Sequence, residues 1–349
     1  MVVNGRFLTQ RVTGVQRFAR EISRAALSQN IWDKTTTRLA APGDSEAPPD
    51  FGGLPVDITG THRGHVWEQL DLPAIAGNDA LINLCNSGPM FRNRQLIVLH
   101  DAAVAALPEN FTLAFKAWYQ VMIRIYGRNA KTIGTVSRFS ADEIIKHFGI
   151  PANKIEIIPE SGEHILDREA DLSINNEFSL ENNGYFLAVS SISSHKNFSR
   201  IVAAASKLKS TKYKFVAVGG KNDRIFNADT VNLSGAIEIG YVSDAQLRAL
   251  YENAACFVYP STYEGFGLPP LEAMSCGCPV IAANAASLPE VCGPGAAYCD
   301  PYDADDIARQ ISRVLGSLQI REELRIAGLA RAKHWTWAKA AHRLGEIDI

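Results

Sequence analysis

Two glutamates separated by seven residues mark the segment of this 349-residue chain that carries most chemical information. Glu264 and Glu272 enclose the run GFGLPPL, and the strand-like run CFVYP precedes them. Gly265 and Gly267 leave the backbone uncrowded, and Pro269–Pro270 suits the first turn of a helix. The pattern predicts a strand, a glycine-rich turn and a helix N-terminus, where backbone N–H groups and the helix dipole favour an anion.

Each glutamate has a chemistry that fits its place. Glu272 lies one helical turn further in, where its carboxylate can accept hydrogen bonds from sugar hydroxyls, as acidic residues do with ribose in other nucleotide sites. Glu264 precedes the turn and is expected nearer to whatever is attached to the phosphate. The plainer alternative is a helix cap followed by a solvated glutamate, and the spacing alone leaves both open.

Other common motifs are missing from the sequence. There is no GxGxxG after a first strand and no GxxxxGK[ST], which argues against a nicotinamide dehydrogenase and a P-loop ATPase. Asp303 and Asp305 form a DxD, but they precede an amphipathic stretch, where Asp is the expected helix cap. Cys276 and Cys278 form a CxC without a second ligand pair. We therefore expect no metal site.

Composition sets the broad class of the protein. Apolar residues make up 46% of the chain, charged residues 21%, and the net charge is −2, which excludes wholesale disorder and gives no reason to expect a nucleic-acid partner. No apolar run approaches the ~18 residues of a membrane span, and the first residues lack the apolar core of a signal peptide. We expect a cytoplasmic protein.

Short apolar runs alternate with amphipathic patterns, first in one half of the chain and then in the other. Strands are expected at Thr36–Ala41, Ala80–Leu84, Leu96–His100, Thr132–Val136, Tyr185–Val189, Lys214–Val218, Ala236–Gly240, Cys256–Tyr259 and Val280–Ala282. Helices are expected at Val15–Leu27, Trp67–Ile75, Leu113–Tyr126, Ala141–Phe148, Phe198–Leu208, Ala245–Ala254, Pro270–Ser275 and Asp305–Leu315. Glu160–Gly184 has no clear period and is interpreted as a linker. The fold class predicted is α/β, with two doubly wound Rossmann-like domains that face a central cleft.

The segment Glu264–Val280 resembles the signature of the retaining glycosyltransferases of family 4, which have the GT-B fold. Further stretches that resemble the family are Asn4–Glu21, Leu96–Asp101, Thr135–Glu143, Ser287–Pro301 and Trp335–Leu344. The resemblance implies an acceptor-binding domain over 1–165 and a nucleotide-sugar-binding domain over 166–334. It also implies that a C-terminal helix within 335–349 crosses back to the first domain.

The family pattern assigns a role to each matching residue near the two glutamates. Glu272 would hold the ribose hydroxyls of the donor, and Glu264 would contact the donor sugar. The backbone N–H groups after Gly265, those of Phe266, Gly267 and Leu268, would bind the distal phosphate.

Three residues elsewhere in the chain also match the family. Lys196 would neutralise the pyrophosphate, His100 would contact the donor sugar near the reacting carbon, and Gly14 would let the backbone approach the phosphates. The plainer alternatives are a solvated lysine at a helix start, a buried strand-end histidine bonded to backbone, and an ordinary turn glycine. Asn284 and Ser287 are further candidates that border the sugar.

The chain departs from the family at two places. Ser191 stands where the family often has an arginine, so the second positive charge beside Lys196 would come from His195 or Lys221. The stretch IPESGEH at Ile158–His164 differs from the usual Pro-Asn-Gly-Val-Asp, and no role is assigned there.

The resemblance implies a metal-independent hexosyltransferase that works with retention and without a cofactor. The opening loop and the VGGKN segment resemble polysaccharide mannosyltransferases, so the favoured donor is GDP-mannose or a GDP-deoxysugar. The expected acceptor is a saccharide, favoured as lipid-linked, in surface polysaccharide or lipopolysaccharide assembly. A nucleotide-sugar epimerase or phosphorylase on the same fold, and a non-catalytic nucleotide-sugar-binding subunit, are the alternatives.

A basic and aromatic stretch suggests contact with a membrane surface. No acidic residue occurs between Asn110 and Ala141, whereas residues 111–138 contain several aromatic and basic side chains. A basic amphipathic helix of this kind is typical of docking on an anionic membrane surface, here the inner face of the cytoplasmic membrane. An ordinary packed helix with a basic face is the alternative.

Overall fold

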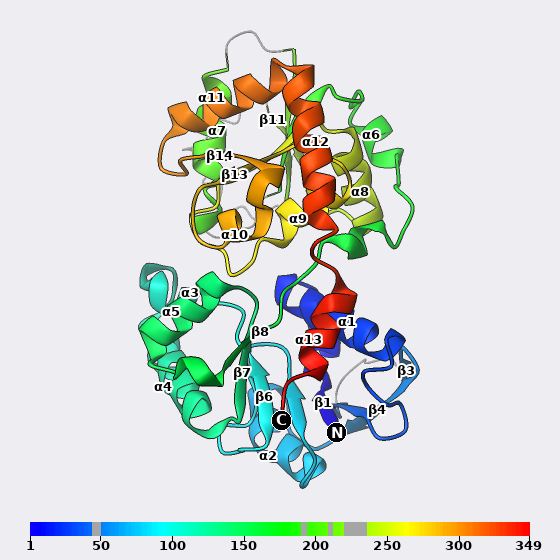
Figure 1. Cartoon of the computed structure of the whole chain (residues 1–349), viewed down its shortest axis with the longest axis vertical. Helices are drawn as coiled ribbons and strands as arrows, with labels where there is room; N and C mark the ends of the chain where they lie inside the picture. The colour runs from blue at the N-terminus through cyan, green and yellow to red at the C-terminus, as the bar shows by residue number, and fades with distance from the viewer. Residues whose placement is uncertain (44–49, 190–193, 209–211, 220–235) are drawn as a thin grey trace. The chain divides into compact units, whose positions relative to one another are not determined.

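The computed structural model describes residues 1–43, 50–189, 194–208, 212–219 and 236–349. The chain forms two compact units (Figure 1). Unit 1 comprises Met1–Glu160 with Trp337–Ile349, and unit 2 comprises Ser161–Thr336. The boundaries predicted from the sequence, 165/166 and 334/335, lie five residues after the first of these divisions and two before the second.

Within the described part of unit 1, eight strands form one sheet in the order β3-β4-β2-β1-β5-β6-β7-β8. The strands are β1 (Val2–Asn4), β2 (Arg38–Pro42), β3 (Asp50–Phe51), β4 (Leu54–Thr59), β5 (Leu81–Asn83), β6 (Gln95–Val98), β7 (Thr132–Thr135) and β8 (Ile155–Ile157). All neighbours are parallel except β3 and β4, which are antiparallel. Their buried apolar runs are typical of a parallel sheet covered on both faces.

Helices pack on this sheet and bury its apolar residues. The α-helices of unit 1 are α1 (Gly14–Ser28), α2 (Gly64–Ala76), α3 (Ala103–Ala106), α4 (Leu113–Asn129), α5 (Arg138–Phe148) and α13 (Trp337–Gly345). The 3₁₀ turns are η1 (Gly5–Thr9), η2 (Pro108–Asn110) and η3 (Ala152–Lys154). The last helix, α13, lies beside α1, so the C-terminal segment rejoins the first domain as the sequence predicted (Figure 1).

Unit 2 contains a fully parallel sheet in the order β11-β10-β9-β12-β13-β14, counted over its described residues. The strands are β9 (Tyr185–Val189), β10 (Lys214–Val218), β11 (Ala236–Ile239), β12 (Cys256–Tyr259), β13 (Val280–Ala283) and β14 (Ala296–Cys299). The helices are η4 (Glu163–Leu166), α6 (Ser173–Glu177), η5 (Ser194–Lys196), α7 (Phe198–Ser206), α8 (Asp244–Asn253), α9 (Leu268–Ser275), α10 (Leu288–Cys292), η6 (Gly293–Gly295), α11 (Ala304–Leu315) and α12 (Leu318–Ala332). The strand order reverses between β9 and β12, which is where ligands bind in sheets of this kind.

The linker interpretation of Glu160–Gly184 is wrong. The segment carries η4 and α6, and its residues pack against α8 and α9 of unit 2. Each of these helices is only about one turn long, too short to show a 3.6-residue period in the sequence. The chain passes between the units at Glu160–Ser161, at the beginning of the expected linker.

Candidate functional site

The segment with the two glutamates folds as the sequence predicted, as a strand, a turn and a helix. β12 ends at Tyr259, and α9 begins at Leu268 with Gly267 as its N-cap. Gly267 has a φ of +116°, and a Cβ there would lie 2.7 Å from the side chain of Leu288. The turn therefore requires glycine. Amide N–H groups in the first turn of a helix have no intrahelical acceptor. Pro269 and Pro270 have no N–H, so the donors that suit an anionic ligand at this end of α9 are those of Leu268 and of the turn before it.

Ser287 braces this turn. Its buried hydroxyl lies 2.9 Å from the carbonyl oxygen of Glu264 and 2.6 Å from that of Phe266. The ring of Phe266 also packs edge-on against Trp335, with 5.4 Å between the centroids. The turn formed by Gly265, Phe266, Gly267 and Leu268 is thus held by side chains from other parts of unit 2. Phosphate binding by its amides stays a prediction.

Lys196 and Glu264 form an ion pair. The ammonium nitrogen of Lys196 lies 2.6 Å from Oε1 and 2.8 Å from Oε2 of Glu264, and it donates to the hydroxyl oxygen of Tyr259 at 2.8 Å. The Tyr259 hydroxyl in turn donates to Oε1 of Glu264 at 2.8 Å. Lys196 follows β9 and Glu264 follows β12, so the pair spans the two strands between which the strand order reverses.

The backbone around Lys196 is fixed to the loop after β12. The backbone N–H of Thr262 donates to the carbonyl oxygen of His195 at 2.8 Å. Asn197, with a φ of +61°, begins α7 and donates from its side chain to the carbonyl oxygen of Pro260 at 3.0 Å. These contacts explain why a lysine that is distant in sequence from Glu264 meets it here.

The contacts among these groups affect the pKa values of Glu264 and Tyr259. Burial raises the pKa of the Glu264 carboxyl, but the charge of Lys196 and hydrogen bonds from Lys196 and Tyr259 outweigh burial, so the pKa lies below its usual range. Burial and the neighbouring Glu264 raise the pKa of Tyr259 well above its ordinary value. Glu264 is therefore a carboxylate, and Tyr259 stays a hydroxyl donor.

Glu272 has two buried partners. Its Oε1 lies 3.0 Å from Nε2 of His164, and its Oε2 lies 3.4 Å from the hydroxyl of Tyr251. His164 belongs to η4 and Tyr251 to α8. Glu272 is therefore not the solvated glutamate of the plainer alternative.

His100 follows β6 in unit 1 and is buried. Its Nδ1 lies 3.1 Å from Oε1 of Glu160, its Nε2 lies 3.0 Å from the carbonyl oxygen of Leu84, and Phe18 packs edge-on against the ring at 4.8 Å. Both ring nitrogens thus contact oxygen acceptors. The contact to backbone matches the plainer alternative for this residue, and its contact with a donor sugar stays a prediction.

The remaining sequence candidates have varied surroundings. Gly14 is exposed at the first position of α1, after the capping residue Thr13. Asn284, after β13, lines a hollow of about 410 Å³ together with residues that follow β14. Ser191 and Lys221 lie outside the described residues, so the structure does not test which group accompanies Lys196.

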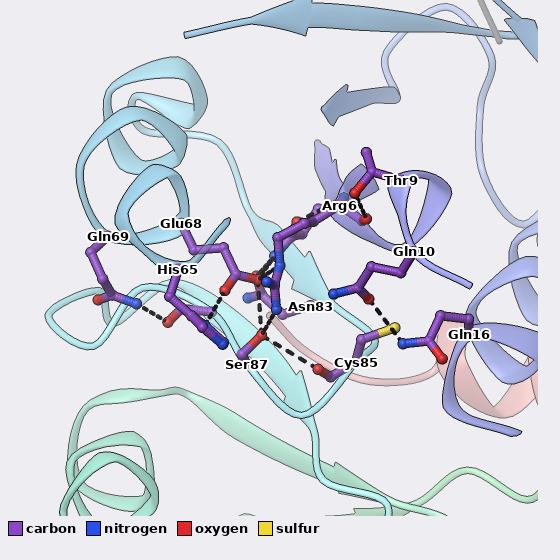
Figure 2. A network of polar contacts seen from close by, with 12 residues as sticks. Arg6, Thr9, Gln10, Gln16, His65, Glu68, Gln69, Asn83, Cys85 and Ser87 are labelled. Carbon is purple, nitrogen blue, oxygen red and sulfur yellow. Dashed lines mark hydrogen bonds and ion pairs between the residues drawn. The ribbon is translucent and has the colours of Figure 1, made fainter. Parts of the chain in front are cut away.

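A polar network that the sequence reasoning missed lies in unit 1 (Figure 2). Glu68 is 1% exposed, and its Oε1 lies 3.0 Å from Nε of Arg6 and 2.9 Å from the hydroxyl of Ser87. Its Oε2 lies 3.0 Å from Nδ1 of His65. Burial raises the pKa of Glu68, but the His65 hydrogen bond and the Arg6 charge outweigh burial and lower it. Asn4, at the end of β1, also donates to Oε1 at 2.9 Å, which places the network where β1 meets β5 and the strand order reverses.

The DxD segment caps a helix, as expected. Asp303 precedes α11, and its side chain accepts from the backbone N–H of Asp305 at 2.8 Å. Asp305 pairs with Lys207 at 2.6 Å. Across the described ranges, no three His, Cys, Asp or Glu side chains gather as a metal site would require.

Sequence signals for the missed residues were weak or unused. Tyr259 is the last residue of the run CFVY, whose pattern indicates a strand and nothing about a polar contact. His164 and Glu160 lie in the stretch Ile158–His164, which departs from the family pattern and was left without a role. A histidine or a carboxylate directly after a strand is a usable signal in such sheets, because ligands bind beyond the carboxyl ends of the strands.

Comparison with known proteins places this geometry in a family. Residues 171–330, which lie in unit 2, match the family described as "Glycosyl transferases group 1". The chain is 34% identical over 255 residues to the O-antigen chain mannosyltransferase B of Escherichia coli, which covers 70% of this chain and 67% of that protein. This chain belongs to the group 1 glycosyltransferases. The match is to a polysaccharide mannosyltransferase, as the sequence predicted.

Two further proteins are similar to this chain, one a longer relative in sequence and the other a solved structure. The serotype-specific mannosyltransferase WbdA of Escherichia coli is 32% identical over 243 residues, which cover 65% of this chain but only 30% of that protein. Among solved structures, WaaG, a glycosyltransferase involved in lipopolysaccharide biosynthesis, has a TM-score of 0.74 at 14% identity and covers 99% of both chains. The fold is therefore GT-B, as predicted.

Proposed function

We propose that this chain is a retaining mannosyltransferase that transfers a hexose from a nucleotide-sugar, most simply GDP-mannose, to a saccharide during polysaccharide assembly. The observation that carries the proposal is the meeting of Lys196 and Glu264 across β9 and β12, with Glu272 on the adjoining helix. Ligands of parallel α/β sheets bind at this point of strand reversal. The O-antigen mannosyltransferase among the relatives supports the choice of sugar and pathway class.

The donor would bind both to the phosphate-binding groups of this site and to its carboxylates. The diphosphate would lie at the N-terminus of α9 near Lys196, and Glu272 would accept hydrogen bonds from the ribose hydroxyls. Glu264 fixes the Lys196 ammonium and would itself face the donor sugar. The residues present therefore fit a nucleoside diphosphate-sugar.

The transfer step needs charge stabilisation more than covalent help from the protein. The bond between the anomeric carbon and the phosphate oxygen breaks, and a bond from that carbon to the acceptor oxygen forms on the same face. The acceptor proton moves to the departing phosphate oxygen. Negative charge grows on the distal phosphate, which Lys196 and the backbone N–H groups of Phe266, Gly267 and Leu268 would stabilise without rearranging. We propose that these groups suffice without an added metal ion.

The acceptor is proposed to bind in unit 1 at the carboxyl ends of its strands. The Glu68 network holds Arg6 and His65 at the point where β1 meets β5 (Figure 2). The side chain of His65 is 56% exposed. The Arg6 guanidinium can donate hydrogen bonds to saccharide hydroxyls, and the His65 ring, whose Nδ1 faces the Glu68 carboxylate, can accept one at Nε2.

We also propose that α4 docks on an anionic membrane surface, which would favour a lipid-linked acceptor. Its first turns expose Leu113 (79%) and Trp118 (46%), and Arg124 and Arg128 are exposed further along the helix. Apolar side chains beside cations suit the interface of an anionic bilayer. None of the helices in the described ranges is long and apolar enough to cross a membrane.

The proposal is tested by a transfer assay with GDP-mannose and octyl α-mannoside as acceptor, followed by NMR of the product. We expect release of GDP and a new α-mannosidic linkage, also in the presence of EDTA. A β-linked product would overturn retention, and a strict requirement for added magnesium would overturn metal independence. Normal transfer by both Lys196→Ala and Glu272→Ala would overturn the site assignment.

A further inference from the structure

A histidine outside the recognised segment contacts the second glutamate of that segment. The side chain of His164 is 1% exposed, and its Nε2 lies 3.0 Å from Oε1 of Glu272. Its Nδ1 lies 3.2 Å from the carbonyl oxygen of Ser161. Carbonyl and carboxylate oxygens only accept, so Nδ1 donates to Ser161 and Nε2 donates to Glu272, and a ring that makes both contacts carries a hydrogen on each nitrogen. The ring is thus held on one side by the backbone of its own loop and reaches Glu272 with the other.

Tyr251 holds the other oxygen of the same carboxylate. Its hydroxyl lies 3.4 Å from Oε2 of Glu272, and burial, with the nearby Glu272 charge, raises the pKa of Tyr251 well above its ordinary value. Tyr251 therefore stays a hydroxyl donor. A carboxylate offers about four acceptor sites, so two protein partners leave capacity for ribose hydroxyls. The side chain of Glu272 is 12% exposed, which leaves it within reach of a ligand.

The loop that carries His164 is shaped to lie close to α9. A Cβ at Gly162 would lie 2.4 Å from the carbonyl carbon of Leu271 and 2.5 Å from the backbone nitrogen of Glu272. Only glycine allows this approach without displacing the backbone. The hydroxyl of Ser161, which is fully buried, donates to the carbonyl oxygen of Trp335 at 2.9 Å and fixes the start of the loop. The position of His164 beside Glu272 therefore follows from the close packing of its loop backbone against α9.

We propose that His164 is a positioning residue for nucleotide binding, because it holds Glu272 in the orientation that accepts the ribose hydroxyls. The inference rests on the proposed role of Glu272. A free glutamate side chain samples several rotamers, and binding must then immobilise it. Pre-ordering by His164 removes that cost, which corresponds to about three- to tenfold in affinity for one side chain.

The test measures how much affinity the ribose hydroxyls contribute. Calorimetry compares GDP (or UDP, whichever binds the wild type more tightly) with its 2′,3′-dideoxy analogue. In the wild type we expect the analogue to bind at least tenfold more weakly. In Glu272→Ala this ratio should fall to about one. In His164→Ala the ratio should fall at least threefold, because the natural nucleotide binds more weakly while the affinity for the analogue is unchanged.

Two conservative variants separate positioning from packing. The amide of His164→Gln reaches as far as Nε2 and can still donate to Glu272, whereas the amide of His164→Asn matches Nδ1 and can keep only the Ser161 contact. We expect His164→Gln to retain the ribose ratio and His164→Asn to lose it. His147→Gln is the matched control, since His147 contacts Glu143 at 3.3 Å in unit 1. It should leave the ratio unchanged.

The outcomes are distinguishable. Suppose that Glu272→Ala lowers the affinity ratio to about one, but that His164→Ala and His164→Asn keep the wild-type ratio, with or without an equal loss of affinity for both nucleotides. His164 then only supports packing, and the inference is overturned. If Glu272→Ala itself keeps the wild-type ratio, Glu272 does not bind ribose. The proposed role of Glu272 then fails, and the positioning role of His164 fails with it.

Discussion

Lys196 and Glu264, which are 68 residues apart in the chain, form an ion pair with 2.6 Å between Nζ and Oε1. The pair joins the ends of β9 and β12, the two strands at which the order of the unit 2 sheet reverses. Tyr259 contacts both partners and completes a closed set of three hydrogen-bonding groups. Lys196 is therefore held by protein contacts alone, and the pair should serve stability as well as the proposed binding of a diphosphate.

Removal of the lysine should destabilise unit 2. Lys196→Met leaves the Glu264 carboxylate largely buried without its cation, which should cost about 2–3 kcal/mol, or about 6 °C in Tm. The double variant Lys196→Met/Glu264→Gln removes both charges and should recover part of this loss. Scanning calorimetry without nucleotide measures both. A double variant that is less stable than Lys196→Met would contradict the pairing.

The stability contribution of Glu264 should depend on pH at the acidic end. Its pKa in the folded protein is lowered from an ordinary value of 4.5, so the ionised form contributes stability above that pH. The contribution is lost as the pH falls below 4.5 and through the folded pKa. The Tm difference between wild type and Glu264→Gln should thus be largest near neutral pH and shrink on acidification. A difference that grows on acidification would have the wrong sign.

Lys196 should affect turnover more than a surface lysine does. Loss of one fixed donor to the leaving phosphate typically costs about 3 kcal/mol, or roughly a hundredfold in kcat. We expect at least a tenfold loss of sugar transfer for Lys196→Ala in a steady-state assay. Lys207→Ala is the control, because Lys207 forms an exposed pair with Asp305 in the same unit. Equal activity losses in the two variants would argue against a specific role for Lys196.

Vesicle binding should depend on α4. Trp118→Ala removes an exposed apolar side chain of α4, and Arg124→Glu removes a positive charge. Both features are expected to hold α4 on an anionic bilayer. We expect each substitution to weaken sedimentation with phosphatidylglycerol vesicles severalfold, and added salt to weaken wild-type binding. Ile326→Ala changes an exposed apolar residue of α12 and should have no effect. Wild-type binding that is absent, or insensitive to salt, would refute the docking proposal.

The sequence predicted the parts of the fold that have a strong local pattern. The run CFVYP, the glycines at 265 and 267 and the two prolines predicted β12, the turn and α9, because each imposes a local backbone preference. The strands β1, β3, β4, β8 and β14 were missed, and three of them, β1, β3 and β8, have only two or three residues. α12 was missed because most of its surface is exposed, which leaves no continuous apolar stripe.

The candidate site could be predicted only in part from the sequence. Glu264 and Glu272 stand out through their spacing, but Lys196 and His164, which contact them, come from distant segments. Lys196 meets Glu264 because β9 and β12 are adjacent, and His164 meets Glu272 because Gly162 admits its loop to α9. No pattern within a single segment encodes such contacts, so the pairing of Lys196 with Glu264 was not foreseen either.

The most direct test of the central claim is a thermal-shift panel with GDP, UDP, ADP and dTDP, without and then with magnesium. A ligand at 100 times its Kd adds about 2.7 kcal/mol of stability, which gives a readily measured rise in Tm. We predict a rise with one base, GDP in the favoured reading, that needs no magnesium and is lost in Glu272→Ala. If no nucleotide raises the Tm, or the rise persists unchanged in Glu272→Ala, the donor does not bind beside Lys196 and Glu272.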